Sequence, residues 1–266
     1  MGIDPSARIH ASAVVEEGAV VGPDCEIGPF CLVGPEAVLG PGVRLKSHVV
    51  VTGWTEIGAE TEIFPFAVVG EIPQDKKFSG ERTRLTIGAR NRIREGVTIN
   101  TGTAGGGGIT RVGDDGLFLA NCHIAHDAQV GDRVVMVNCA SLAGHCVVGD
   151  DVIIGGLSGV HQHVRIGRGA IIGAVTMVTH DVIPYGLVHA SRGVLEGLNL
   201  VGLKRRGVAK EDITALRAAF QALAQGEGSF VQRAERLSGE KPGSRYVRDV
   251  VDFVLAASDR SFLTPG

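Results

Sequence analysis

The sequence predicts an all-β prism of stacked coils followed by a small helical region. The first observation is a repeat in which every sixth residue is aliphatic from Ile9 to Val69. The second is composition: 39 of the 266 residues are glycine and 5% are aromatic, which suits a core of small side chains joined by tight turns. The third is that the repeat stops after Pro184, where apolar residues take up helical spacing.

The repeat, whose unit we call a hexad, resumes after each of two breaks. It continues from Ile87 to Ile99 in the original phase and from Val112 to Val178 one residue out of phase. A period of six fits a short strand plus a turn, with one inward side chain on each side of a prism, so three hexads make one coil. Glycine often follows the inward residue, as at Gly28, and there we expect the backbone to bend.

The two breaks predict loops at residues 71–84 and 100–111, because these segments are charged or glycine-rich. Loops on a rigid scaffold commonly carry binding residues. We expect a β domain over residues 1–190 and a helical domain over residues 191–266. Two apolar runs indicate helices in the second domain, one beginning at Lys210 (Ile213, Leu216, Phe220, Leu223) and one further along (Val247, Val250, Val251, Val254).

Composition excludes several classes of protein. The net charge of −3 gives no global bias toward nucleic acid or anionic membranes. Five cysteines are an odd number, lack a CxxC motif and lie within apolar repeats, so we expect buried thiols in a reducing cytoplasm. The N-terminus has no apolar signal core and no segment is long and apolar enough to span a membrane, so we expect neither secretion nor a transmembrane helix.

Histidines gather on one predicted face. Residues that are three hexads apart should stack at the strand spacing of about 4.8 Å. His123 and His126 flank one inward position of this face, and His145 and His161 follow the inward positions of the next two coils. We therefore expect three adjacent coils to bring these four histidines together.

Gly144 lies three hexads after His126, so no side chain is expected beside that imidazole. The glycine leaves room for a ligand and exposes a backbone N–H. A histidine base and an N–H donor are the two groups that acyl transfer requires. Asp127 is suited to hold the imidazole in one tautomer, although adjacent strand residues usually point to opposite faces and the backbone would have to bend locally.

Six motifs follow one another in a specific order: GEIPQDKKFSGE, NRIREGVTI, HIAHD, LAGH, GLSGVHQ and GLKRRG. In their order and spacing the chain resembles, over essentially its whole length, the UDP-N-acetylglucosamine acyltransferases of lipid A biosynthesis. The resemblance implies a left-handed parallel β-helix of hexapeptide repeats with a helical C-terminal domain, assembled as a homotrimer with sites between subunits. It implies transfer of a 3-hydroxyacyl chain from acyl carrier protein to the 3-position of UDP-N-acetylglucosamine, the first step of lipid A assembly.

The resemblance also implies roles for individual residues. It makes His126 the general base, Asp127 its polarising partner and Gly144 the oxyanion donor, with no metal and no cofactor beyond the carrier's phosphopantetheine. The histidines implied to line the sugar and thioester site are His123, His145 and His161. The other implied substrate contacts are Gln74, Asp75 and Lys77 in the first loop, and Gln162, Asn199, Arg205 and Arg206 near the nucleotide and its phosphates.

Three departures from the family pattern affect specificity. Asn100-Thr101-Gly102-Thr103 stands where His-Arg-Gly-Thr is usual, and some relatives take a 3-amino sugar, so ester and amide formation both stay open. Val201 replaces a frequent glutamate near the nucleotide, so we expect one polar contact fewer. Ala174, three hexads after Gly156, matches a glycine at the floor of the acyl groove, and its methyl group should favour a shorter acyl chain.

Other functions are compatible with parts of this pattern. Some hexapeptide β-helix proteins are zinc enzymes of the carbonic anhydrase type, and His123, His126, His145, His161 and Cys122 are suitable zinc ligands. An acetyl-CoA-dependent sugar acetyltransferase and a carrier-binding scaffold without activity are further alternatives.

Overall fold

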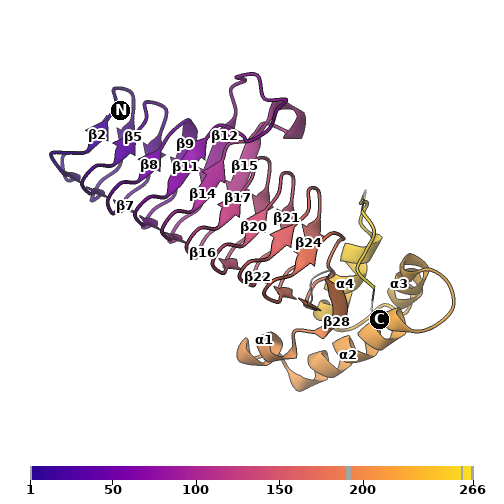
Figure 1. Ribbon diagram of the computed structural model, residues 1–266. Coiled ribbons are helices and arrows are strands. Elements are labelled where there is room, and N and C mark those ends of the chain that lie inside the picture. Colours follow the sequence, from indigo (N-terminus) through magenta and orange to yellow (C-terminus); the bar gives the residue numbers. More distant parts are fainter. Residues whose placement is uncertain (1, 190–192, 259, 265–266) are drawn as a thin grey trace.

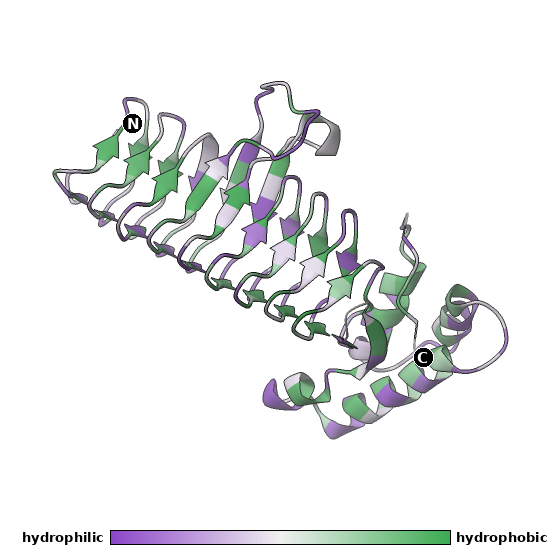
Figure 2. Ribbon diagram, in the orientation of Figure 1, coloured by the Kyte–Doolittle hydropathy of each residue, from purple (hydrophilic) through white to green (hydrophobic). Residues whose placement is uncertain are grey.

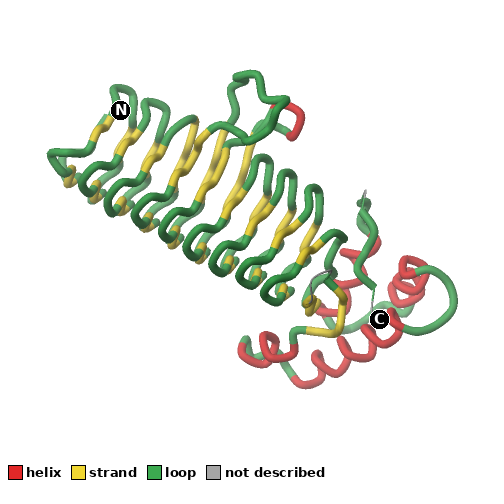
Figure 3. Tube along the Cα trace, viewed as in Figure 1, coloured by secondary structure: helices red, strands yellow, loops and turns green. Residues whose placement is uncertain are grey.

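The computed structural model describes residues 2–189, 193–258 and 260–264. The chain forms a three-sided prism of parallel strands, with helices packed at its C-terminal end (Figure 1). It passes through a first, a second and a third sheet in turn and then begins the next coil. Most strands are two residues long and are joined by tight turns, as Figure 3 shows.

As far as β26, each sheet contains every third strand in chain order, and β27 and β28 then both join the first sheet. The first sheet contains β1 (Arg8–Ile9), β4 (Glu26–Ile27), β7 (Arg44–Leu45), β10 (Glu62–Ile63), β13 (Arg92–Ile93), β16 (Leu117–Phe118), β19 (Val135–Met136), β22 (Ile153–Ile154), β25 (Ile171–Ile172), β27 (Gly186–His189) and β28 (Val194–Leu198). The second contains β2 (Val14–Val15), β5 (Leu32–Val33), β8 (Val50–Val51), β11 (Val68–Glu71), β14 (Thr98–Asn100), β17 (His123–Ile124), β20 (Ser141–Leu142), β23 (Gly159–Val160) and β26 (Met177–Val178). The third contains β3 (Val20–Val21), β6 (Val38–Leu39), β9 (Trp54–Ile57), β12 (Arg84–Ile87), β15 (Ile109–Val112), β18 (Gln129–Val130), β21 (Val147–Val148) and β24 (Arg165–Ile166).

The register confirms the coil of three hexads. Val112 pairs with Val130, and Val130 with Val148. The two predicted breaks are insertions into coils, because Ile57 pairs with Ile87 and Ile87 with Val112, and both steps are longer than three hexads. The inserted residues form loops between β11 and β12 and between β14 and β15, and the second loop contains the short 3-10 helix η1 (Ala104–Gly106). Both loops leave the prism where the chain passes from the second sheet to the third, which we call the second–third edge (Figure 1).

Inward aliphatic side chains fill the prism. Ile63, Ile99 and Leu142 have no exposed surface, and apolar residues recur in every coil in Figure 2. The thiols occupy the same interior: Cys25, Cys31, Cys122 and Cys146 are buried. Cys139 departs from the prediction that all five thiols are buried. It is exposed because it lies in a turn.

A residue with left-handed backbone conformation recurs in the turns, for example His48 at φ 55° and Phe66 at φ 65°. The glycine that follows an inward residue serves a different purpose from the predicted bend. At Gly28 φ is not positive, and an added Cβ would lie 1.5 Å from the carbonyl oxygen of Lys46. Glycine is therefore required there because the next coil approaches the backbone too closely for any side chain.

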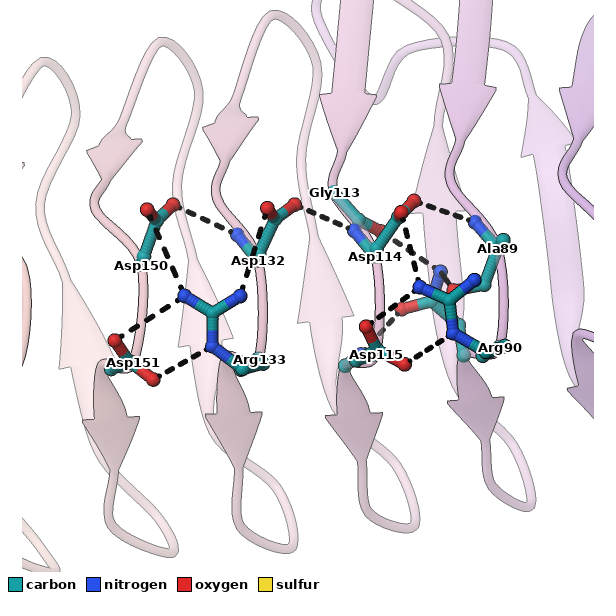
Figure 4. Close-up of polar contacts among 11 residues, drawn as sticks. Ala89, Arg90, Gly113, Asp114, Asp115, Asp132, Arg133, Asp150 and Asp151 are labelled. Carbon is teal, nitrogen blue, oxygen red and sulfur yellow. Dashed lines mark hydrogen bonds and ion pairs between the residues drawn. The ribbon is translucent and has the colours of Figure 1, made fainter. Parts of the chain in front are cut away.

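The edge between the third and first sheets is held by a column of carboxylates. Asp114, Asp132 and Asp150 each accept a backbone N–H from the neighbouring coil, at 2.8 to 3.0 Å, as Figure 4 shows. Arg90 and Arg133 form ion pairs with aspartates of the same edge. These side chains satisfy turn N–H groups that the strand ladder does not use.

The C-terminal segment begins as a continuation of the first sheet. Strand β27 pairs in parallel with β25, and β28 pairs antiparallel with β27. Four helices follow: α1 (Leu200–Arg205), α2 (Lys210–Ala224), α3 (Phe230–Gly239) and α4 (Arg245–Leu255). The two predicted helical runs are confirmed as α2 and α4, whereas α3 was not predicted. The predicted domain boundary, between residues 190 and 191, lies outside the described residues.

After α4 the chain returns to the prism. Asp181 donates its backbone N–H to the carbonyl oxygen of Ser261 at 2.9 Å and accepts one from Leu263 at 2.8 Å. Its buried carboxylate also accepts a hydrogen bond from Nε of Arg165 at 2.7 Å. We call residues 256–258 and 260–263 the C-terminal strap. Among the described residues, no helix is both long and apolar enough to cross a lipid bilayer.

The close approach at Gly28 predicts that alanine lowers stability more at this position than at a glycine with open space around it. Gly28→Ala forces the neighbouring coil to shift and should lower the free energy of unfolding by about 3 kcal/mol, at the upper end of overpacking costs. Gly197→Ala is the matched control, because its added Cβ would have no atom within 4 Å. Thermal and denaturant unfolding of both variants measures the difference. Equal stability of the two variants would contradict the proposed packing of the turns.

Candidate active site

His126 and Asp127 form a buried pair at the second–third edge. They occupy the turn between β17 and β18, and their exposed fractions are 6% and 4%. Nδ1 of His126 lies 2.8 Å from Oδ2 of Asp127. Asp127 has φ 61°, so the left-handed turn supplies the bend that lets neighbouring residues face each other. Because a carboxylate only accepts hydrogen bonds, the neutral form of this imidazole carries its proton on Nδ1 and its free lone pair on Nε2.

The second loop holds the Asp127 carboxylate in place. Thr103 donates its backbone N–H to Oδ1 at 2.8 Å and its hydroxyl to Oδ2 at 2.6 Å. The backbone N–H of Asp127 donates to Oγ1 of Thr110, on β15, at 2.8 Å. Each carboxylate oxygen therefore has a partner, and the orientation of the imidazole that Asp127 holds is determined by the loop.

Gly144 lies directly beneath the His126 ring. An added Cβ would lie 2.5 Å from Cε1 and 2.7 Å from Nε2 of His126. The space that we expected to receive a ligand is thus occupied by the imidazole itself. The Gly144 N–H has no acceptor among the residues that the structure describes. The coil does not need an N–H at this turn position, because other turns have proline there (Pro23, Pro29, Pro35).

A column of ring contacts continues from His126. His145 meets the His126 ring edge-on at 5.0 Å between centroids and stacks on His163 at 4.4 Å with an interplanar angle of 4°. The pKa of His145 is lowered, mainly by burial; His163 and His126 lower it further, while Asp127 opposes the shift. This shift favours the neutral form of the His145 ring.

The four predicted histidines are not all in mutual contact, because ring contacts among the described residues join His126 to His145 but do not include His123 or His161. His161 follows the inward position of its coil, but Arg260 of the C-terminal strap lies 3.2 Å from its Nδ1, and no ring contact joins it to the other histidines of the described chain. His163 takes the expected place. His123 lies beside the group, with Nδ1 2.7 Å from the Thr98 hydroxyl and a pKa lowered first by burial and then by His126.

Sequence reasoning missed two residues of this edge. His163 carried a signal, since it lies three hexads after His145 in the same turn position. Arg260 carried none: it is 99 residues from His161 and reaches this edge only because the C-terminal strap folds back.

The first loop closes a groove over the histidine column. We call this the histidine groove; it has a volume of about 530 Å³ and unites residues from both loops with the column. Its lining residues are Asp75, Lys77, Phe78, Ser79, Glu81, Thr103, Ala104, Gly105, His145 and His163. The structure thus brings the predicted Asp75 and Lys77 to His145. Gln74 is exposed in the same loop and does not line the groove.

Other predicted residues lie at different edges of this chain. Asn199 caps α1 and donates to the carbonyl oxygen of Gly169 at 3.2 Å, at the edge between the third and first sheets. Arg205 and Arg206 end α1 nearby, and Arg206 lines a separate cleft there. Gln162 is exposed at the second–third edge, beside His161.

The acyl-groove candidates occupy the remaining edge. Gly156 follows β22 and Ala174 follows β25, at the passage from the first sheet to the second. The two are stacked as expected, since Val175 donates its N–H to the carbonyl oxygen of Gly156 at 2.8 Å. Within one chain, the acyl-groove residues therefore lie at a different edge of the prism from His126.

Three side chains could hold a metal ion. The donor atoms of His126, Asp127 and His145 lie within 4.8 Å of one another. Cys122, which we considered as a ligand, points into the core and donates to the carbonyl oxygens of Met136 and Val137. Burial raises the pKa of its thiol to about 11, which disfavours the thiolate that zinc requires. His126 and Asp127 already satisfy each other, so the cluster resembles a catalytic dyad more closely than a zinc site.

Comparison with known proteins identifies the family. Residues 181–263 match the family model described as UDP-N-acetylglucosamine O-acyltransferase, domain 2. The chain is 67% identical over 203 residues to the acyl-[acyl-carrier-protein]–UDP-N-acetylglucosamine O-acyltransferase of Paracoccus denitrificans, covering 76% of this chain and 77% of the relative. It is 50% identical over 263 residues to the Rhizobium etli enzyme of the same name, covering 99% and 97%.

A solved structure shows the same architecture. The UDP-N-acetylglucosamine acyltransferase from Campylobacter jejuni superposes with a TM-score of 0.92 at 37% identity, over 97% of this chain and 100% of that one. The predicted fold class, a left-handed parallel β-helix followed by helices, is confirmed. By sequence and structure, the chain is an acyltransferase that belongs to the acyl-[acyl-carrier-protein]–UDP-N-acetylglucosamine O-acyltransferase family.

Proposed function

We propose that this protein transfers a 3-hydroxyacyl chain from acyl carrier protein to the 3-position of UDP-N-acetylglucosamine, the first step of lipid A biosynthesis. The names of its relatives support the substrates. The observation that carries the mechanism is the buried His126–Asp127 pair directly above the unpaired N–H of Gly144. A base and an oxyanion donor side by side are the minimal machinery for acyl transfer.

In the proposed reaction His126 acts as general base through Nε2. It removes the proton from the sugar 3-hydroxyl as the oxygen attacks the thioester carbon, and the carbonyl oxygen becomes an oxyanion that accepts the Gly144 N–H. Collapse of the tetrahedral species breaks the carbon–sulfur bond, and the imidazolium returns its proton to the leaving thiolate of the carrier's phosphopantetheine. Asp127 stabilises the imidazolium throughout. These steps need neither a covalent enzyme intermediate nor a metal.

The substrate-binding residues suggest a homotrimer. Asn199, Arg205, Arg206 and the acyl-groove residues lie at other edges than His126, so a site that uses all of them must combine edges of neighbouring chains. The edge that carries Ala174 also exposes Leu157 (68%) and Val175 (61%), which would be buried against a second chain. In this assembly Asp75 and Lys77 contact the substrate, and His123, His145 and His161 line the sugar and thioester site. Gln162, Arg205 and Arg206 lie near the nucleotide, where the two arginines bind the diphosphate.

The position of Asn100 leaves the acceptor atom open. Asn100, which replaces a histidine usual in the family, is buried and donates to the carbonyl oxygens of Glu71 and Ile72 at 3.2 and 2.9 Å. It therefore braces the first loop and does not line the histidine groove. UDP-N-acetylglucosamine and its 3-amino analogue are both candidate acceptors, giving an ester or an amide. We place the reaction in the cytoplasm, in keeping with five free thiols.

A mass-spectrometric assay tests the proposed function. Purified protein with 3-hydroxyacyl carrier proteins of several lengths should convert UDP-N-acetylglucosamine or its 3-amino analogue into a product heavier by one hydroxyacyl group. A chelator should leave the rate unchanged. His126→Ala should reduce turnover by about 1,000-fold or more through loss of the base, while oligomeric state and thermal midpoint stay near those of the wild type. Absence of product with both acceptors, or dependence on zinc or acetyl-CoA, would contradict the proposal.

Ala174 predicts the acyl preference. Removing its methyl group should deepen the acyl groove, because the side chain lies at the predicted floor. We expect Ala174→Gly to shift the ratio of kcat/KM for longer over shorter 3-hydroxyacyl carrier proteins by about tenfold, the effect of roughly one methylene in an apolar pocket. Competition between donors, read by the mass of the product, measures the ratio. An unchanged ratio would show that Ala174 does not limit the groove.

A further inference from the structure

His163 lies at the second–third edge but has no part in the reaction described above. It is the third member of a column in which Asp127, His145 and His163 follow one another at intervals of three hexads, with φ values of 61°, 62° and 64°. Because the backbone conformation is the same, the three side chains leave successive coils in the same direction. His163 also lines the histidine groove together with His145.

The His145 ring is held between two other imidazoles. His163 covers one face, with rings nearly parallel and centroids 4.4 Å apart, and His126 meets it edge-on at 5.0 Å. Nδ1 of His145 lies 3.7 Å from Oδ2 of Asp127, so this nitrogen is turned toward the carboxylate and Nε2 is left for a substrate. The pKa of His145 is lowered, since burial, His163 and His126 together outweigh the opposing effects of Asp127 and Asp75, and this favours the neutral form of the ring.

We propose that His163 is a positioning residue, which holds the imidazole plane of His145 so that this ring meets the UDP-sugar in one orientation. A side chain with a single fixed rotamer loses less entropy when the ligand binds. The inference rests on the proposed function for the identity of the sugar. It assigns to His163 no contact with the reacting atoms.

The chain itself shows that phenylalanine is compatible with the turn position of His163 and contacts a histidine ring one coil away, there at a tilt of 32° to 35°. Phe30 and Phe66 occupy equivalent turn positions with φ 59° and 65°, and their rings lie 4.9 and 5.1 Å from that of His48. A phenylalanine is thus compatible with this backbone and packs against a histidine one coil away. His163→Phe should keep the flat partner of His145, whereas His163→Ala removes it.

Steady-state kinetics of these variants test the proposal. We expect His163→Ala to lower kcat/KM for the UDP-sugar about five- to tenfold, chiefly through KM, because an aromatic pair is lost while the base and oxyanion donor remain. His163→Phe should stay within about twofold of the wild type. In a His145→Ala background, His163→Ala should cause no further loss, since its effect passes through His145.

The matched control is His48→Ala, which removes a histidine with tilted ring contacts from the same kind of turn at another edge and should leave kcat/KM unchanged. Unchanged kcat/KM in His163→Ala, equal loss in His163→Phe and His163→Ala, or a further loss in the His145→Ala background would each overturn the positioning role. Failure of the proposed function is distinguishable, because the wild-type protein would then form no acylated UDP-sugar at all.

Discussion

Each strand of the prism forms backbone hydrogen bonds with the strand one coil away, and this ladder determines which residues lie above one another. The register of three hexads places Gly144 against His126 and His163 against His145. A shift of one residue would turn the inward aliphatic side chains outward, so burial of the core enforces the register of the catalytic edge. The geometry of the site is therefore inherited from the packing of the interior.

The loops adapt this scaffold without disturbing it. Each insertion leaves the prism and returns to the same ladder, so Ile57 still pairs with Ile87 and Ile87 with Val112. Both insertions lie at the edge that carries His126. The second loop satisfies the Asp127 carboxylate through Thr103, and the first covers the histidine groove. A rigid repeat supplies the base and the N–H donor, and less regular segments supply the surfaces that distinguish one substrate from another.

Much of the fold followed from periodicity alone, because one inward aliphatic residue per six leaves few alternatives to a three-sided coil. The position of Gly144 next to His126 followed from the same period, because the two residues are three hexads apart. Arg260 did not, since its arrival beside His161 depends on tertiary contacts of the C-terminal strap. The exposed position of Cys139 depends on its place in a turn, which an apolar pattern does not indicate. The sequence predicted a backbone bend at Gly28, but the glycine is required by the close approach of the next coil. Such an approach between coils cannot be read from a sequence.

Replacement of Gly144 by alanine tests most directly whether the stacked register creates the catalytic site. The three atoms nearest to the added methyl group all belong to the His126 ring and none to the backbone, so the coil should fold with a thermal midpoint close to that of Gly197→Ala. The imidazole, however, would have to leave its place above the N–H, and kcat/KM should fall by about 100-fold, within the range of a misplaced general base. Activity near the wild-type level, in a protein of unchanged stability, would contradict the account.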